Sequence, residues 1–536
     1  MPIRRRQSPR QSFDSPAAII LSLSIVCLAV TLYFTQRSWA YNSDDVAWQT
    51  ILLSWHLGHT VYLGAKDNFI SHVPFFQLLG YLFAPSRTVL GVEATIMAVL
   101  NFILFFVASR YFLRRCKVPL GYSALLPFLW LASSGYGFEQ LFLNSNWRDF
   151  EVGVSFIFFM LAARYYYDEL YPLRSKRTII LTGLACAVVG AYVYSDPYFF
   201  YFTLVPIVLF FEVLYLVGKV DKSKTLFILG AAIVSIIIAW LIELCMSQFR
   251  FLIPKGKPIG FAGFHHLIAN SSLAVRAVFT IFGASFAGVH GLGVALLAAV
   301  CNSMVILFVA YVLYQSRAVL RMGVKAIWAD RPHELWRGFL GALTLLVLLA
   351  YILSSTETDI LTYRYLIILI FACTLLIALY QLIPRKDRWL LNSLLVLATL
   401  LNLANSYNGT RYVNHTLPDN QRNSANYAVI NTVQRLGLSK GYSGFWDANI
   451  NTYLSKGRIW FLPITCSTGR AQPLHLLVDS TLFTQPSARS FYLVDPDIST
   501  NPPLCSQEQI IMQFGEPNRT VKVLGRTILI YNHDLM

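Results

Sequence analysis

The stretch Ala17–Thr35 reads AAIILSLSIVCLAVTLYFT and contains no charged side chain. A helix of about twenty apolar residues is long enough to cross the hydrocarbon core of a bilayer. Comparable stretches recur at Val89–Ser109, Thr178–Tyr194, Leu226–Met246 and Leu390–Ser406. One apolar stretch would be compatible with a signal peptide, but a series is not. The sequence therefore predicts a mainly α, polytopic transmembrane helix bundle.

Composition agrees with a membrane protein. Of 536 residues, 56% are hydrophobic and 13% are charged, whereas a soluble chain carries about 25% charged residues. The basic residues behind the net charge of +16 are concentrated in alternate loops rather than in one stretch of the chain. Alternate loops and the N-terminus hold 23 Lys and Arg, and the opposite loops before the tail hold nine. Because basic loops stay in the cytoplasm, this charge encodes orientation, and no nucleic-acid partner is expected.

About eleven membrane helices are predicted, with the N-terminus inside and the C-terminus outside. Three outer segments are apolar but are placed in long loops, at Val46–Leu63, Val73–Phe83 and Leu267–Phe286. We expect these segments to lie along the membrane interface. The predicted helices are 17–36, 88–112, 120–135, 150–169, 178–195, 198–217, 225–246, 291–314, 336–354, 363–382 and 389–407.

The composition becomes polar from about residue 408, which divides the chain into a transmembrane domain (1–407) and an extracytoplasmic soluble domain (408–536). The tail is expected to be a small α/β domain with a helix at Asn426–Leu436. Cys466 and Cys505 are the two cysteines of this tail, and an exported tail favours a disulfide between them. Strands are expected at Ile459–Pro463, Ser490–Val494, Val521–Val523 and Thr527–Tyr531.

Asp44 and Asp45 form an acidic pair just after the first predicted helix. A partly desolvated carboxylate at a membrane interface has a raised proton affinity, which suits a general base. The neighbouring acid could orient the base or bind a cation. The alternative is that Asp44 caps a helix that starts near Val46.

Other charged residues lie at the same predicted membrane face. Arg148, Asp149 and Glu151 open the fourth helix, where charges usually face a cavity or one another; the alternative is an interfacial ion cluster. Asp196 lies in a Tyr-Ser-Asp-Pro-Tyr segment that is either a structural turn or part of the same cavity.

Three basic residues suit an anionic ligand on this face. Arg364, in Thr-Tyr-Arg-Tyr-Leu, could bind a phosphate through two hydrogen bonds, or could extend to the interface. Lys255 and Lys257 lie in the long loop before the eighth helix, which is either a phosphate-binding loop or a solvated one.

Taken together, these features resemble the GT-C class of membrane glycosyltransferases, in particular the branch of protein mannosyltransferases and lipid A aminoarabinose transferases. The resemblance covers roughly residues 10–385 through topology and short motifs. It implies a catalytic base at Asp44 or Asp45, a second acid at Asp149 and a phosphate-contacting Arg364. It also implies that the loop from Arg250 to Gly288 closes over the site.

The sequence departs from that class in three ways. It has Asp-Asp where many members have Asp-Glu, it lacks the proline that often follows the arginine motif, and its tail is unlike the usual domains. Within the tail, Trp446, Asp447 and Asn449 could contact a sugar, or could belong to a small core with a buried tryptophan.

The function implied is transfer of a sugar, with inversion, from a polyprenyl-phosphate donor to a hydroxyl of a glycan, lipid or protein acceptor on the extracytoplasmic side. A divalent cation is compatible with this chemistry, but no ligand set in the sequence requires one. We expect the chain in a cell membrane, with a bacterial inner membrane preferred. The alternatives are a transporter or lipid flippase, and a non-catalytic membrane assembly protein.

Overall fold

The structure is a computed structural model. It describes residues 15–38, 87–116, 120–133, 175–195, 200–248, 261–284, 293–321, 332–354, 366–380, 385–416, 423–466, 469–475, 478–494 and 504–536. Between these ranges it also describes Val46, Thr50, Leu53, Ser54, Val118, Ser155, Phe159, Ala162, Ala163, Tyr166 and Phe286.

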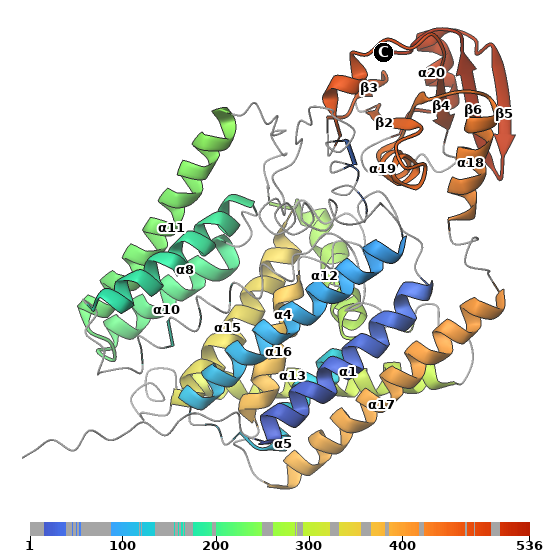
Figure 1. The fold of residues 1–536 in the computed structure, drawn as a ribbon. Coiled ribbons are helices and arrows are strands. Elements are labelled where there is room, and N and C mark those ends of the chain that lie inside the picture. The colour runs from blue at the N-terminus through green and yellow to red at the C-terminus, as the bar shows by residue number, and fades with distance from the viewer. Residues whose placement is uncertain are drawn as a thin grey trace, which may run out of the picture.

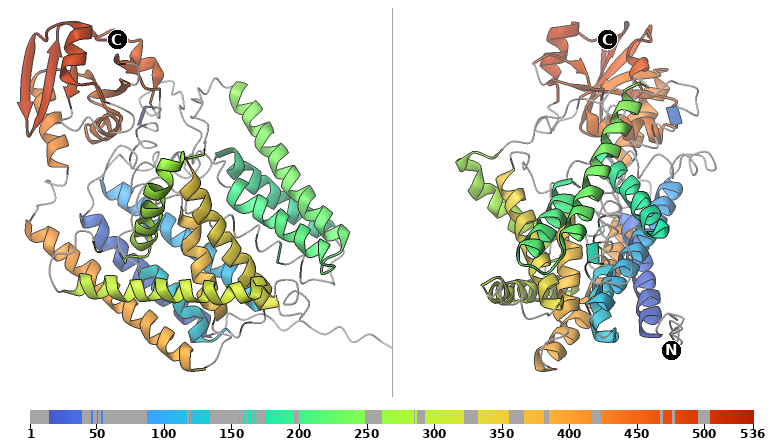
Figure 2. Two further views of the ribbon diagram at one scale, coloured as in Figure 1. Left: turned by 180° about the vertical axis from the view of Figure 1, so that it is seen from behind. Right: turned by 90° about the vertical axis from the view of Figure 1, so that its left-hand side faces the viewer.

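The first three quarters of the chain form a helix bundle, and a small α/β domain lies beyond one end of it (Figures 1 and 2). The helix α1 begins at the end of the bundle remote from this domain. The bundle contains α1 (Ser15–Ser38), α4 (Arg87–Arg115), α5 (Tyr122–Ser133), α8 (Lys176–Ser195), η1 (Phe200–Leu204), α10 (Val205–Leu216), α11 (Lys222–Gln248), α12 (Phe264–Ile281), α13 (Val294–Arg321), α15 (Pro332–Leu353), α16 (Ile367–Tyr380) and α17 (Arg385–Thr416).

Within the described ranges, five helices are long and apolar enough to cross a membrane: α1, α11, α13, α15 and α17. Each contains a segment of 19 to 24 residues with few charges. The helices α5, α8, α10 and α16 are shorter but also apolar. The predicted polytopic bundle is therefore confirmed, while the count of eleven spans and the orientation stay predictions.

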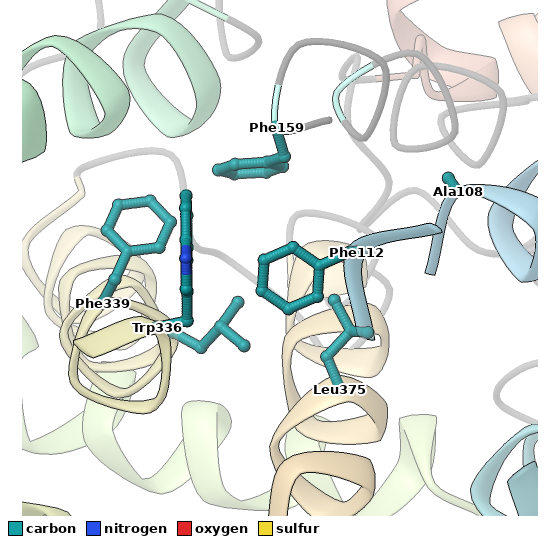
Figure 3. Close-up of a pocket in the computed structure, with 7 residues that line it drawn as sticks. Ala108, Phe112, Phe159, Trp336, Phe339 and Leu375 are labelled. Atoms are coloured by element: carbon teal, nitrogen blue, oxygen red, sulfur yellow. The ribbon is translucent and has the colours of Figure 1, made fainter. Parts of the chain in front are cut away.

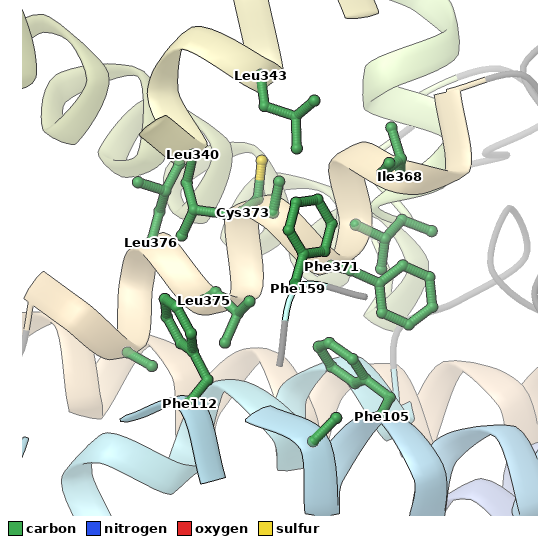
Figure 4. Close-up of a cluster of buried hydrophobic side chains, with 14 of the residues drawn as sticks. Phe105, Phe112, Phe159, Leu340, Leu343, Ile368, Phe371, Cys373, Leu375 and Leu376 are labelled. Atoms are coloured by element: carbon green, nitrogen blue, oxygen red, sulfur yellow. The ribbon is translucent and has the colours of Figure 1, made fainter. Parts of the chain in front are cut away.

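The helix α16 forms the centre of the bundle. Every side chain from Ile368 to Tyr380 is buried, as expected for a helix that is apolar on all sides. Phe371 meets Phe105 of α4 edge-on, with ring centroids 4.4 Å apart. Figure 4 shows how side chains of α4, α15 and the position Phe159 converge on α16.

The outside of the bundle is apolar, as a lipid-facing surface requires. Trp240 of α11 and Leu307 of α13 are each 58% exposed, and many other large apolar side chains are exposed beside them. Soluble proteins rarely expose contiguous apolar surface on this scale. These faces are therefore suited to acyl chains rather than water.

Close helix packing explains why α8 and α11 lie together. A Cβ added to Gly190 of α8 would approach the backbone oxygen of Ser235 in α11 to 2.6 Å. Small residues at such positions allow membrane helices to approach closely. Gly190 therefore sets the distance between these two helices.

A polar cluster joins three helices inside the bundle. The Trp130 indole of α5 donates to Asn302 Oδ1 at 2.9 Å, and Asn302 Nδ2 of α13 donates to Asn402 Oδ1 of α17 at 2.8 Å. Asn302 and Asn402 are buried. Because an unpaired amide is costly in a membrane interior, this cluster fixes how α5, α13 and α17 align.

The C-terminal domain has one six-stranded mixed sheet of order β3-β2-β1-β4-β6-β5. The strands β2, β1 and β4 are parallel, and the crossover from β1 to β2 is α19. In chain order the elements are α18 (Ser424–Arg435), β1 (Lys440–Ser443), α19 (Phe445–Leu454), β2 (Trp460–Thr465), β3 (Gln472–Pro473), η4 (Ser480–Phe483), β4 (Ser490–Val494), α20 (Gln507–Phe514), β5 (Arg519–Val523) and β6 (Arg526–Tyr531).

Two apolar layers cover the sheet. One contains Val429 and Val433 of α18 and Ala448 of α19. The other contains Phe483 and Ile510, together with Cys466 and Cys505, which form a disulfide. The four predicted strands and the helix at Asn426–Leu436 are confirmed, with shifts of no more than two residues.

Several elements differ from the sequence-based expectation. The strand β1 and the helix α19 were not expected, because Gly441 lowers the strand propensity of β1 and because α19 is rich in Asp, Asn and Thr, which have modest helix propensities. Gly441 is required in β1, since the Phe491 ring lies 2.4 Å from where its Cβ would be. The last bundle helix, α17, runs nine residues past the predicted end at 407, to Thr416. The predicted span 150–169 falls largely outside the described residues.

Candidate functional site

The charged residues that the sequence singles out before residue 408 lie outside the part of the chain that the structure describes. They are Asp44, Asp45, Arg148, Asp149, Glu151, Asp196, Lys255, Lys257 and Arg364. The neighbours of several of them are described, and these neighbours show which elements hold the candidate segments.

The residue that follows the acidic pair is anchored on the C-terminal domain. Val46 is fully buried and clusters with Ile450 and Tyr453 of α19. The Thr50 hydroxyl lies 2.9 Å from the Val46 oxygen and 3.3 Å from the Asn449 oxygen of α19. A segment near the start of the chain is thus packed against a helix near its end (Figure 1).

The anchored segment has a helical pattern. Val46, Thr50, Leu53 and Ser54 are helical, are spaced as one helix face and are all buried. The sequence predicted that Val46–Leu63 lies along the membrane interface. At Val46 and Thr50 the structure instead shows contact with α19, so protein covers these positions.

The helix α19 is held firmly by its own domain. Asp447 pairs with Arg526 of β6 at 2.6 Å. The Thr452 hydroxyl accepts the Phe461 N–H of β2 at 3.0 Å. These contacts fix the face that carries Ile450 and Tyr453.

The predicted sugar contact in this helix does not match the structure. Asp447 is 4% exposed and ion-paired, and Asn449 is 1% exposed. Trp446 is half-buried, with its ring edge-on to Phe445 at 5.3 Å. The Asp447 and Asn449 side chains are therefore buried, which does not fit direct contact with a sugar; Asp447 pairs with Arg526, and Asn449 Nδ2 has no hydrogen-bond partner among the described residues.

The amino end of α19 is also covered. A Cβ on Gly444 would lie 2.1 Å from Leu504, the residue before the disulfide-bonded Cys505. Open α/β sheets usually bind ligands where strand order reverses, here between β1 and β4. Leu504, 8% exposed, occupies that place.

Two other candidate segments are linked to each other. The hydroxyls of Ser155 and Thr203 lie 2.8 Å apart and are buried. Ser155 follows Glu151 by four residues, and Thr203 follows Asp196 by seven. Thr203 belongs to the π-helical turn η1, a form that is rare and frequent at functional sites. Ser155 and the π-helical turn η1 therefore lie side by side in the bundle.

The segment of Arg364 joins the central helix. Leu366, two residues later, is fully buried and leads directly into α16. Arg364 therefore precedes by three residues the helix α16, in which every side chain from Ile368 to Tyr380 is buried.

One pocket within the described part of the bundle does not have the properties of a donor site. Its lining is wholly apolar, with Phe112, Phe159, Trp336 and Phe339 around a cavity of about 10 Å³ (Figure 3). This volume is about that of one water. Phe112 and Trp336 also lie near the ends of α4 and α15 that are remote from the C-terminal domain.

No three His, Cys, Asp or Glu side chains are grouped to hold a metal ion among the residues that the structure describes. A divalent cation therefore remains a prediction attached to the acidic pair. The residues that sequence reasoning missed are Thr50, Ile450 and Tyr453. Their only sequence signal is the helical spacing of apolar residues on each side, which does not show that the two segments meet.

No protein-family model and no curated protein matches the chain. Among solved structures, it is similar to the archaeal oligosaccharyltransferase AglB from Archaeoglobus fulgidus, in complex with an inhibitory peptide and a dolichol-phosphate. That match has 13% identity and a TM-score of 0.44, over 82% of this chain and 64% of the archaeal one. The chain thus spans less than two thirds of that enzyme.

The chain is also similar to ArnT from Cupriavidus metallidurans bound to undecaprenyl phosphate, with 10% identity and a TM-score of 0.43. This match covers 96% of the present chain and 98% of the other. The apo structure of the same protein matches with 12% identity and a TM-score of 0.43.

Proposed function

We propose that this protein is a membrane glycosyltransferase that moves a sugar from a polyprenyl-phosphate donor to an acceptor hydroxyl on the extracytoplasmic side. The observation that carries the proposal is the burial of Val46 against α19. Val46 directly follows Asp44 and Asp45. The proposal places this acidic pair, next to the contact, at the membrane surface, where a donor held in the lipid meets an acceptor in water.

In this proposal Asp44 or Asp45 is the general base. It takes the proton of the acceptor hydroxyl while the hydroxyl oxygen bonds to the anomeric carbon. The bond between that carbon and the lipid-phosphate oxygen breaks, and the polyprenyl phosphate leaves from the opposite face. A single displacement inverts the anomeric centre, through an oxocarbenium-like transition state like that of glycosidases.

Positively charged side chains next to the departing phosphate stabilise its negative charge and so assist bond cleavage. Arg364 is proposed as the main phosphate contact, with Arg148, Lys255 and Lys257 as further cations. Asp149, Glu151 and Asp196 are proposed to line the same cavity. The link between Ser155 and Thr203 supports a common location for the Arg148–Glu151 and Asp196 segments.

The test uses the purified full chain and undecaprenyl-phosphate sugars. Asp44→Asn and Asp45→Asn are assayed singly for glycoside formation and release of undecaprenyl phosphate. We expect one of them to lower the transfer rate at least 100-fold, within the range for loss of a general base. Asp221→Asn is the matched control, because Asp221 is an exposed carboxylate outside the proposed site.

Unchanged transfer in both variants would exclude the base assignment. Movement of lipid or sugar across vesicle membranes without any glycoside product would favour the transporter or flippase. Absence of both activities would favour an assembly protein.

A further inference from the structure

We propose that the face of α19 formed by Asn449, Ile450 and Tyr453 is a positioning surface that sets the geometry of the first outer segment, residues 46–54. The inference rests on the proposed function in one respect, which is that the acidic pair directly before this segment contains the catalytic base. The contact itself does not depend on that function. Positioning here means that α19 holds the segment, and that catalysis depends on this.

The segment is too short to be rigid alone. Val46 to Ser54 is nine residues, whereas isolated helices shorter than about 12–15 residues are marginal in water. The positions of this segment that the structure describes are buried, from Val46 at 0% exposure to Leu53 at 6%. Contacts with other elements therefore hold Val46 and Thr50 in place, and α19 makes two of them.

The contact combines an apolar and a polar part. Val46 packs with Ile450 and Tyr453, and the Thr50 hydroxyl reaches the Asn449 oxygen one turn later. The two contacts are four residues apart on one helix face, so together they restrict both translation and rotation of the segment. A single apolar contact would leave rotation free.

The surface is rigid on its own side. The helix α19 is anchored to β6 through Asp447 and Arg526 and to β2 through Thr452 and Phe461. Gly444 and Leu504 pack at its amino end. Displacing the face that holds Val46 would therefore disturb the sheet, and the position of the segment follows that of the whole domain.

Covalent geometry links the surface to the acidic pair. Neighbouring Cα atoms are about 3.8 Å apart, so the backbone of Asp45 begins one bond from the anchored Val46. Misplacing a catalytic group by about 1 Å can lower a rate about 100-fold. The C-terminal domain would then act on the reaction without touching either substrate.

Two substitutions of the same kind test this. Val46→Ala and Val433→Ala each remove two methyl groups from a side chain with 0% exposure. Val433 lies between α18 and the sheet, in an apolar cluster that does not contain Val46. Both variants lose stability, but we expect only Val46→Ala to lower the transfer rate, by about 10-fold or more, with undecaprenyl-phosphate affinity unchanged.

The hydroxyl contact has its own pair of variants. Thr50→Val keeps the shape and removes the donor, and Thr50→Ser restores it. We expect Thr50→Val to lower the transfer rate several-fold and Thr50→Ser to recover most of it. A rate that falls equally in both would indicate a packing effect only and would overturn the polar half of the proposal.

Hydrogen exchange provides a readout that is independent of activity. In the full-length protein, Tyr453→Ala is expected to raise amide exchange in peptides covering residues 46–54 at least 10-fold, and Val433→Ala is expected to leave them unchanged. Unaltered exchange in Tyr453→Ala overturns the positioning surface even if transfer is lowered. Raised exchange in Tyr453→Ala, together with a wild-type protein that transfers no sugar, would retain the surface and reject the glycosyltransferase.

Discussion

Lys440 and Asp534 form an ion pair of 2.7 Å that fastens the end of the chain to the first strand of the C-terminal sheet. Asp534 also accepts hydrogen bonds from the Tyr442 hydroxyl and from the Ser487 N–H. One carboxylate thus joins β1, the approach to β4 and the segment that follows β6.

The first prediction concerns acid stability. Burial alone would raise the pKa of Asp534, but hydrogen bonds from Lys440 and Tyr442, together with the Lys440 charge, lower it below the usual value. A carboxyl with a lowered folded pKa contributes stability above its unfolded pKa of about 3.9, and loses it as pH falls through the folded pKa. Asp534→Asn should remove this contribution.

Thermal melting of the detergent-solubilised protein between pH 2 and 7 checks this. The variant should be less stable by about 3 kcal/mol at pH 7, because Lys440 is left unpaired in a largely buried place. Its melting temperature should change less with pH below 4 than that of the wild type. Parallel pH profiles for the two proteins would contradict the assignment.

The second prediction concerns helix spacing. Gly190→Ala should weaken the packing of α8 on α11, because the new methyl group clashes with the backbone oxygen of Ser235, which cannot move as a flexible side chain can. Gly183→Ala in the same helix is the matched control, since nothing lies within 4 Å of its added Cβ. The control should gain up to about 1 kcal/mol from helix propensity.

Thermal melting should thus move in opposite directions for the two alanines, with a loss of about 1–3 kcal/mol for Gly190→Ala from overpacking. Equal effects would show that α8 and α11 do not approach as closely as described.

The third prediction concerns the disulfide. Cys466 and Cys505 close a loop of 39 residues, for which the chain-entropy relation gives about 4 kcal/mol of stabilisation. Cys466→Ser with Cys505→Ser should lower the stability of the C-terminal domain by about that amount.

Thiol labelling tests the disulfide directly by counting the free cysteines. In denaturant without reductant, a maleimide should modify six of the eight cysteines, and after reduction all eight. Eight modified cysteines before reduction would contradict the pairing and remove one reason to place the tail in an oxidising compartment.

The fourth prediction separates a structural from a binding role for Asp447. Because its carboxylate is buried against Arg526, Asp447→Ala should cost roughly 2–3 kcal/mol through an unpaired guanidinium and lost hydrogen bonds. The acceptor KM should stay within a factor of two. A raised KM at unchanged stability would restore the sugar-contact interpretation.

The membrane helices could be predicted from the sequence because a charge-poor run of about twenty residues has few stable alternatives in a bilayer. The strand β4 was predictable for a similar local reason, since Ser490–Val494 is short and rich in aromatic and branched residues. Cys466 and Cys505 were paired because no other cysteine lies in the tail. In each case the information is contained in a short segment.

The helix α19 and its contact with Val46 could not be found in this way. Gly441 and Gly444 are required by the Phe491 ring and by Leu504, and both of these lie more than forty residues away. The hydrogen bond between Thr50 and Asn449 joins residues 399 apart. Neither segment has a local pattern that specifies its partner.

That separation has a consequence for biosynthesis. A ribosome adds roughly 5–20 residues per second, so the interval between making Thr50 and making Asn449 is on the order of 20–80 s. During this time Val46 and Thr50 have no α19 to pack against. The chain therefore completes this contact only after all helices of the bundle have been made, and a protein truncated before residue 449 would contain those helices but could not form the contact.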